Sequence, residues 1–142
     1  MDLLELFNHM PFADHLGIEM VEIGDGRAVG LLELSEEHSS RPDRTIAHGG
    51  VAYALADTVG GAAAISVSET VTPTIDMRID YLSPATGGTL RAEGEVLRSG
   101  NSVAAVEVTI TDENGTTIAT ARGTYKTSGG EGESPWRGDS AH

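Results

Sequence analysis

The sequence predicts an α+β fold in which one curved antiparallel sheet wraps around one long central helix. Residues 51–65 are apolar almost all round, as expected for a helix that is covered on most sides. Four later segments alternate apolar and polar residues, which is the side-chain periodicity of β-strands. Two segments before the helix flank the turn residues Gly24-Asp25-Gly26 and indicate a β-hairpin.

The chain is predicted to begin with a short helix. Residues 2–10 place Leu3, Leu4 and Phe7 on one helical face. Pro11 is expected to end this helix, because proline lacks the backbone N–H that a helix interior requires.

The hairpin strands are expected at residues 18–23 and 27–34. A polar loop at residues 35–45 then leads to the apolar helix. His15 and His38 are isolated in the sequence, and we expect both at the surface.

Gly60 and Gly61 lie inside the predicted long helix. This is unusual, because each Gly destabilises a helix interior by about 1 kcal/mol relative to Ala. Small residues let another backbone approach closely, so we expect either tight wrapping by the sheet or contact with a second subunit at this point.

Four strands are expected after the helix, separated by turns that include the Asn-Gly pair of residues 112–115. Their apolar faces are predicted to be Ile75, Met77, Ile79 and Tyr81; Leu90, Ala92, Gly94 and Val96; Ala104, Val106, Val108 and Ile110; and Ala119, Ala121 and Tyr125. One such sheet curved around one helix is the hotdog fold, and we expect a single hotdog domain over residues 1–127. Residues 128–142 are rich in Gly, Ser and Glu and are predicted to form a disordered acidic tail.

The composition argues against several classes of partner and site. The net charge of −13, from 22 acidic and 9 basic residues, disfavours nucleic acid and anionic membranes as partners. The chain has no Cys and offers no cluster of metal-ligand residues, so we expect no metal and no cofactor. It shows neither an apolar run of transmembrane length nor a secretory signal, and we therefore expect a cytoplasmic protein.

The acidic excess has two interpretations. The simpler one is a solvated surface that keeps the protein soluble. The other is adaptation to a high-salt cytoplasm, where counterions screen the mutual repulsion of the carboxylates.

Asp57 is the one carboxylate within the apolar helix and the first candidate for chemistry. Burying an ionised carboxylate without compensation is costly, so its presence there requires a reason. A charged group held in a dry place, ready to react, is the reason we favour.

The start of the helix is the second candidate. Gly49 and Gly50 carry no side chains that would shield the free N–H groups of a helix N-terminus, so a developing oxyanion could bind there; a merely flexible turn is the alternative. Asp57 lies eight residues beyond Gly49, about 12 Å along a helix axis. One carbonyl cannot touch both, and the spacing therefore predicts a site shared across a symmetric dimer.

The chain resembles the PaaI-type branch of the hotdog-fold acyl-CoA thioesterases, the 4-hydroxybenzoyl-CoA thioesterase superfamily. The resemblance is carried by His48-Gly49-Gly50 with Asp57 nine residues after the His, by residues 74–77 leading to Tyr81-Leu82-Ser83-Pro84-Ala85, and by residues 112–115 before the last strand. It extends from about Phe12 to Lys126.

The resemblance implies roles for individual residues. Asp57 would be a general base or a nucleophile, and the Gly49 N–H of the partner subunit would polarise the thioester carbonyl. His48 would brace the loop, and Thr74 would orient the attacking water, although strand threonines are usually structural. The substrate would contact Gly50, and an acyl pocket between subunits would be lined by Val51 and Leu55.

Two positions depart from the family pattern. Family members often carry Asn where this chain has Pro42, and Asp43 could replace only the acceptor of that amide. Asn101 stands where a basic residue often meets a coenzyme A phosphate. Arg98, Arg78 and Arg44 are the alternatives for this contact, and each is equally well explained as a surface charge.

These residues predict a thioesterase that converts acyl-CoA and water to a free acid and coenzyme A. The alternative is a hotdog module that binds acyl-CoA without hydrolysing it. A hotdog dehydratase is disfavoured, because its pattern of a catalytic His beside an acid is not found. Phenylacetyl, hydroxybenzoyl and medium-chain acyl groups all remain open, as does the choice between a homodimer and a homotetramer.

Overall fold

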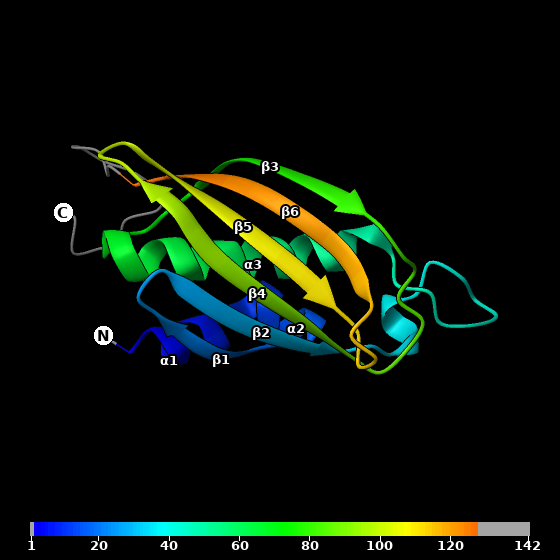
Figure 1. The fold of residues 1–142 in the computed structure, drawn as a ribbon. Coiled ribbons are helices and arrows are strands. Elements are labelled where there is room, and N and C mark those ends of the chain that lie inside the picture. Colours follow the sequence, from blue (N-terminus) through cyan, green and yellow to red (C-terminus); the bar gives the residue numbers. More distant parts are fainter. Residues whose placement is uncertain (1, 128–142) are drawn as a thin grey trace.

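In the computed structural model, which describes residues 2–127, six antiparallel strands form one sheet wrapped around a central helix (Figure 1). The helices are α1 (Leu3–Asn8), α2 (Pro11–Leu16) and α3 (Gly49–Ser68), with a short 3-10 helix η1 at Glu36–His38. The strands are β1 (Ile18–Gly24), β2 (Arg27–Glu33), β3 (Thr74–Tyr81), β4 (Thr89–Ser99), β5 (Val103–Thr111) and β6 (Thr117–Lys126). The predicted hotdog fold is thereby confirmed.

The strand order in the sheet is β1-β2-β4-β5-β6-β3. The strand that directly follows α3 therefore lies at the far edge, paired with the last strand through registers such as Met77 opposite Gly123. The two edges of the sheet are β1 and β3. This arrangement places β3 beside the helix and leaves its outer side without a strand partner among residues 2–127.

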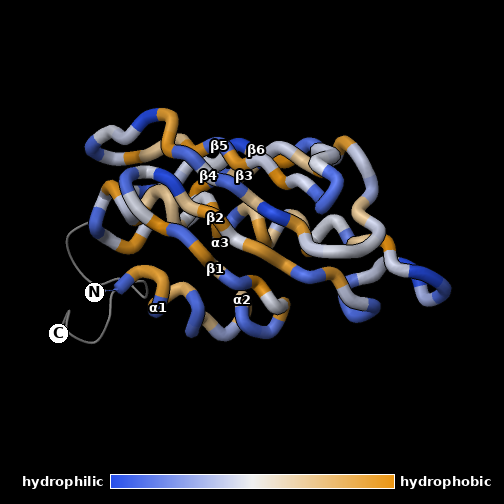
Figure 2. The backbone as a smooth tube through the Cα atoms, turned by 60° about the horizontal axis from the view of Figure 1, so that its bottom comes forward, coloured by the Kyte–Doolittle hydropathy of each residue, from blue (hydrophilic) through white to orange (hydrophobic). Residues whose placement is uncertain are grey.

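The core lies between α3 and the concave face of the sheet. Leu55 and Val59 of the helix are fully buried, as are Leu90 of β4 and Val106 of β5. Along β4 and β5 every second residue points inward, which confirms the predicted alternation. Figure 2 shows hydrophobic and hydrophilic stretches following one another along the strands.

Helix α3 is long and apolar enough, by length and composition, to cross a membrane. The prediction that the chain has no such run is therefore wrong on that criterion. Within the fold, 56% of the segment is buried. Its apolar character has a structural explanation, because the sheet covers the helix along much of its length.

Pro11 begins a helix rather than ending one. Helix α1 is capped by Asp2, whose Oδ1 accepts from Leu4 N at 3.0 Å, and it ends at Asn8. Pro11 then occupies the first turn of α2, where its missing N–H would have no helical acceptor in any case. The prediction of one helix over residues 2–10 is corrected to two short helices.

Helix α1 is attached to the edge strand β1 through one side chain. The Asn8 carboxamide accepts from Met20 N at 2.9 Å and donates to Met20 O at 3.1 Å. It therefore satisfies both main-chain groups of Met20, as a neighbouring strand would. The bulge between Met20 and Glu22 lies at this same point.

His38 is buried, contrary to the prediction of a surface residue. Its Nε2 lies 2.7 Å from Leu16 O, and its Nδ1 accepts from Ser35 N at 3.0 Å. The His38 main-chain O accepts from His48 N at 2.8 Å. The side chain thus connects the end of α2 to the segment that leads into α3. The predicted tail at residues 128–142 lies outside the described residues.

Candidate active site

Asp57 projects from the third turn of α3, and its side chain is half-buried. Its Oδ1 accepts a hydrogen bond from Thr74 Oγ1 at 2.7 Å. The Tyr125 hydroxyl lies 3.0 Å from the same Oδ1 and 3.0 Å from the Asp57 main-chain O. Among residues 2–127 the second carboxylate oxygen, Oδ2, has no partner. One oxygen is held and the other is available for chemistry.

Tyr125 reaches Asp57 from strand β6, through the core. The residue is only 1% exposed, and its burial, followed by the nearby charge of Asp57, raises the pKa of its hydroxyl far above 10.0. The phenol therefore remains protonated and acts as a donor. Sequence analysis placed Tyr125 on an inward face but missed its contact with Asp57.

The pair Gly60-Gly61 is explained by the same tyrosine. A Cβ on Gly60 would lie 2.4 Å from the Tyr125 hydroxyl, and one on Gly61 would lie 3.5 Å from the ring. The sheet does pack tightly against the helix at Gly60 and Gly61, as expected. The atoms that come close belong to the side chain of Tyr125 and not to a backbone. An inward-facing tyrosine together with a helical Gly-Gly pair is the sequence signal that could have indicated this contact.

The start of α3 presents one free amide. His48 is the N-cap, and its Nδ1 accepts from Gly50 N at 2.8 Å, so the Gly50 N–H is engaged within the chain. Within the part of the chain that the structure describes, the Gly49 N–H has no acceptor. Gly49 is thus the donor that remains available at the positive end of the helix.

Strand β3 is attached to α3 by three hydroxyl groups. Thr74 donates to Asp57, Tyr53 donates to Met77 O at 3.1 Å, and Tyr81 donates to Gly49 O at 2.7 Å. On the helix these contacts involve Gly49, Tyr53 and Asp57, which follow one another at intervals of four residues, about one helical turn. Partial burial, with the nearby Tyr53, raises the pKa of Tyr81, so this hydroxyl also remains a donor at neutral pH.

A pocket of about 360 Å³ opens between the helix start and the segment after β3. Its lining residues are Ala47, His48, Gly49, Ala52, Tyr81, Leu82, Ser83, Pro84, Ala85, Leu90 and Ile118. Val51 and Leu55, predicted to line an acyl pocket, are instead buried in the core of the single chain, at 7% and 0% exposure. Helix geometry directs Ala52, not Val51, toward the pocket.

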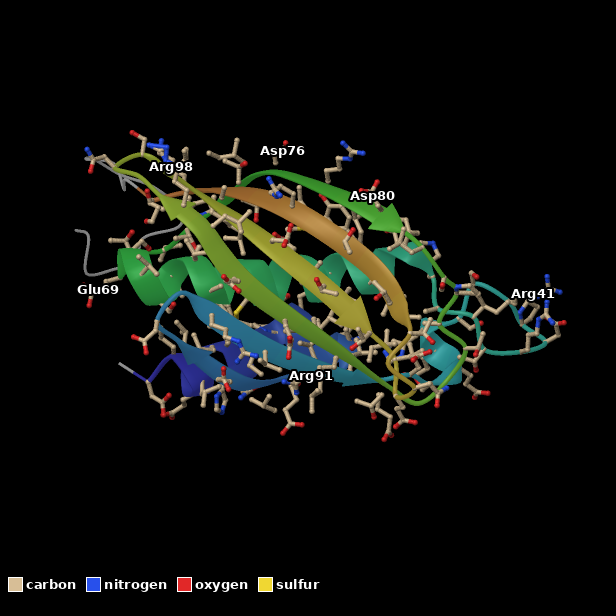
Figure 3. The ribbon with its side chains drawn as sticks, in the orientation of Figure 1. Arg41, Glu69, Asp76, Asp80, Arg91 and Arg98 are labelled. Atoms are coloured by element: carbon tan, nitrogen blue, oxygen red, sulfur yellow. The ribbon has the colours of Figure 1, made fainter. Side chains whose placement is uncertain are left out.

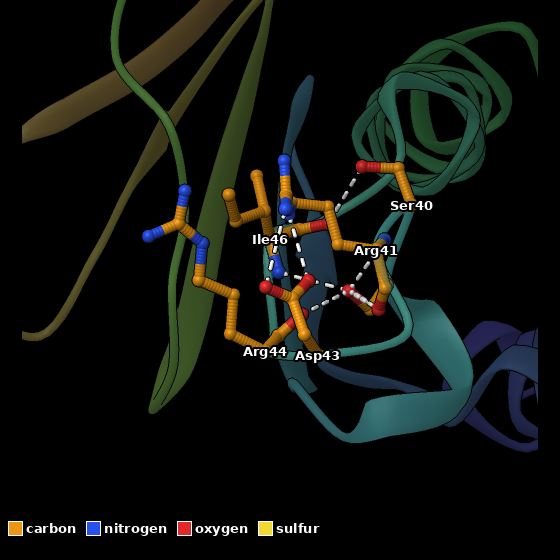
Figure 4. Close-up of polar contacts among 6 residues, drawn as sticks. Ser40, Arg41, Asp43, Arg44 and Ile46 are labelled. Atoms are coloured by element: carbon orange, nitrogen blue, oxygen red, sulfur yellow. Dashed lines mark hydrogen bonds and ion pairs between the residues drawn. The ribbon is translucent and has the colours of Figure 1, made fainter.

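The loop before the helix is organised by its own contacts (Figure 4). Asp43 binds Arg41 with both oxygens, at 2.9 Å and 3.1 Å, and this contact lowers the pKa of the exposed Asp43 carboxyl. The Ser39 Oγ accepts from the main-chain N–H groups of Arg41 and Ile46, each at 3.0 Å. Asp43 therefore does not point its acceptors toward the Gly49 amide in this structure, because Arg41 occupies them.

The residues predicted to contact coenzyme A are spread over the chain, and of these Arg44 lies in the loop directly before the helix start. Figure 3 shows Arg98 at the end of the molecule opposite to Arg41. Asn101 lies beyond Arg98, in the turn between β4 and β5. Arg78 contacts Asp80 at 3.4 Å, and both side chains are exposed. Among residues 2–127, no group of three His, Asp or Glu side chains is arranged to hold a metal ion.

Comparison with known proteins gives a consistent result. The family model described as Thioesterase superfamily matches residues 45–119, a range that contains the helix start, Asp57 and Thr74. The medium/long-chain acyl-CoA thioesterase YigI of Salmonella typhimurium is 30% identical over 132 residues, covering 82% of this chain and 85% of that protein.

Two further comparisons extend this similarity. The 1,4-dihydroxy-2-naphthoyl-CoA hydrolase of Listeria monocytogenes is 32% identical over 107 residues, covering 73% of this chain and 85% of that protein. The structure of the Escherichia coli PaaI protein superposes with a TM-score of 0.80 at 26% identity, covering 89% of this chain and 90% of that one.

Proposed function

The chain belongs to the thioesterase superfamily and is a thioester hydrolase, and from this premise we propose that it hydrolyses acyl- or aryl-CoA thioesters with Asp57 as its catalytic carboxylate. The observation that carries the proposal is the arrangement of that carboxylate. One oxygen is fixed by Thr74 and Tyr125, and the other has no partner among residues 2–127. A carboxylate held in this way can accept a proton from water or attack a carbonyl carbon.

The oxyanion donor is proposed to come from a second copy of the chain. Asp57 and the free Gly49 N–H lie on the same helix, about 12 Å apart along its axis, so one carbonyl cannot reach both within a single chain. The edge strand β3 has no strand partner on its outer side among residues 2–127, and its Ile75 is exposed, which supports pairing with another copy. A twofold dimer would then contain two equivalent sites.

The proposed reaction begins when the thioester carbonyl oxygen binds the Gly49 N–H of the partner subunit. Asp57 Oδ2 takes a proton from water, and the water oxygen attacks the carbonyl carbon. The tetrahedral oxyanion is stabilised by the same N–H group. It then collapses, the C–S bond breaks, and the proton held by Asp57 passes to the departing coenzyme A thiolate. Thr74, which holds Oδ1, keeps the carboxylate in position.

A nucleophilic route uses the same atoms in a different order. Oδ2 attacks the thioester carbon directly, coenzyme A leaves, and water hydrolyses the resulting mixed anhydride. In a single turnover in ¹⁸O-labelled water, the general-base route places the label in the product acid alone. Label in the peptide that contains Asp57 therefore establishes the nucleophilic route with attack of water on the aspartyl carbonyl. If water attacks the acyl carbonyl instead, the label goes to the product, and the nucleophilic route is detected by chemical trapping of the anhydride.

The pocket at the helix start is proposed to receive the acyl or aryl group. It is lined mainly by apolar side chains and lies beside the Gly49 amide. The relatives act on medium- and long-chain acyl-CoA and on an aryl-CoA, so both classes belong in the test. Arg98 and Asn101 of a partner subunit are the proposed contacts for coenzyme A.

Replacement of Asp57 tests the proposal. Asp57→Asn is expected to lower kcat/KM by about 100-fold or more, because the amide can neither accept the proton nor attack the carbon. Activity is measured as thiol release from phenylacetyl-, 4-hydroxybenzoyl-, octanoyl- and palmitoyl-CoA. Asp25→Asn is the matched control, since it removes the same charge at an exposed turn with φ of 52° that Asn also adopts. Full activity of a folded Asp57→Asn protein on every thioester would refute the assignment.

A further inference from the structure

Tyr125 stands out among the buried polar groups because it contacts Asp57 twice. Its hydroxyl lies 3.0 Å from Asp57 Oδ1 and 3.0 Å from the Asp57 main-chain O. The residue belongs to β6, 68 positions further along the chain, and it enters the site from the core. Solvent reaches only 1% of it.

Two glycines beside Tyr125 leave the space that its ring and hydroxyl occupy. A Cβ on Gly60 would lie 2.4 Å from the hydroxyl oxygen, closer than real contacts allow. On β6 itself, a Cβ on Gly123 would lie 2.6 Å from Met77 Cε and 2.9 Å from the Tyr125 ring. Gly60 also destabilises the helix by about 1 kcal/mol relative to Ala. Glycines in both α3 and β6 therefore leave room for Tyr125, and the glycine in α3 lowers the stability of the helix.

The contacts determine which carboxylate oxygen can react. Oδ1 is in reach of two hydroxyl donors, from Thr74 at 2.7 Å and from Tyr125 at 3.0 Å. Oδ2 has no partner among residues 2–127. The terminal torsion of an Asp side chain is broad, so a carboxylate held by one donor alone can rotate and exchange its two oxygens. A second donor, fixed by burial in the core, restricts that rotation.

We propose that Tyr125 is a positioning residue of the thioesterase: with Thr74 it binds Oδ1 of Asp57 and thereby presents Oδ2 to the water or the thioester. This inference rests on the proposed role of Asp57. Because Tyr125 is only 1% exposed, it acts through the carboxylate and not by direct contact with the substrate.

Tyr125→Phe tests the inference, because it removes the hydroxyl and keeps the buried ring. We expect kcat to fall by about 10- to 100-fold, as for the loss of one hydrogen bond to a charged group. KM should stay within about twofold, since the substrate does not contact Tyr125.

Tyr53→Phe is the matched control. It removes the same atom from a tyrosine whose hydroxyl donates to Met77 O and does not contact Asp57. A general loosening of the fold would affect both variants alike, whereas a positioning role lowers kcat at unchanged KM only in Tyr125→Phe. Thermal unfolding of both variants establishes that each is folded at the assay temperature.

The outcomes separate this inference from the proposed function. If Asp57→Asn is inactive while Tyr125→Phe keeps the kcat of the unmodified protein, the positioning role is refuted and the catalytic carboxylate stands. If Asp57→Asn is fully active, the proposed function itself fails. An equal fall of kcat in Tyr125→Phe and Tyr53→Phe also refutes a specific role for Tyr125.

Discussion

The hydroxyl of Tyr125 lies in the core beside a carboxylate, and this has a consequence at alkaline pH. Burial and the charge of Asp57 raise the pKa of Tyr125 above 10.0, whereas the unfolded chain titrates near that value. Above about pH 10 the unfolded state therefore releases a proton that the folded state retains. Stability is fully present below this pH and falls as the pH rises, by about 1.4 kcal/mol per pH unit for one such group.

Tyr125→Phe should make the alkaline loss of stability less steep. The free energy of unfolding is measured by urea titration at several values between about pH 9 and 11, for the unmodified protein and the variant. The two curves should converge as the pH rises. Parallel curves would show that Tyr125 titrates alike in the folded and unfolded states, contrary to its buried position.

The residues of the site differ in how far the sequence could reveal them. The spacing of His48-Gly49-Gly50 and Asp57 is local, and both groups lie on α3 as predicted. The contact between Tyr125 and Asp57 joins residues that are 68 positions apart, and no local pattern encodes it. Burial of His38 was missed for a related reason: its acceptor, Leu16 O, lies 22 positions earlier.

The elements of the fold were largely predictable because strand periodicity is a local property. The alternation in β4 and β5 follows from burial of one sheet face, and each predicted strand is present. The order of strands was not predictable from periodicity, because the position of β3 depends on where the chain re-enters the sheet after α3. Pro11 was misassigned since proline is equally compatible with a helix end and a first helical turn.

The edge strand β1 is protected by one side chain of α1, and this can be tested by substitution. Asn8→Ala removes both partners of the Met20 main chain, a change expected to destabilise the fold by about 1–3 kcal/mol. The measurement is urea unfolding. Asn101→Ala is the control and should change stability by less than about 0.5 kcal/mol, because the Asn101 side chain makes no hydrogen bond to any of residues 2–127. Equal effects would show that Asn8 adds nothing beyond an ordinary surface residue.

The whole molecule carries far more negative charge than its ion pairs neutralise. The outer face of the sheet has short-range pairs, such as Arg91 with Glu93 at 2.8 Å and Arg122 with Glu107 at 3.2 Å. Exposed pairs of this kind contribute little to stability. With 22 acidic and 9 basic residues in the full sequence, net repulsion opposes the compact state.

Salt should therefore stabilise the protein. The midpoint of thermal unfolding, measured from about 0.05 to 2 M KCl, is expected to rise as the Debye length shortens and repulsion is screened. A rise that ends at a few hundred millimolar indicates simple screening of a solvated surface. A rise that continues to molar salt favours adaptation to a high-salt cytoplasm. A midpoint that is unchanged or falls throughout would contradict both interpretations.

The three hydroxyl bonds between α3 and β3 have a consequence for how such a chain can diverge. Thr74 holds the carboxylate at one end of the strand and Tyr81 holds Gly49 at the other. The separation of Asp57 and Gly49 along α3 therefore matches the separation of Thr74 and Tyr81 along β3. A residue inserted into or deleted from only one of these two elements would break the match, and the hydrogen bonds at both ends could not form together. Changes of length should accumulate instead in the loop around Arg41, which lies outside this frame.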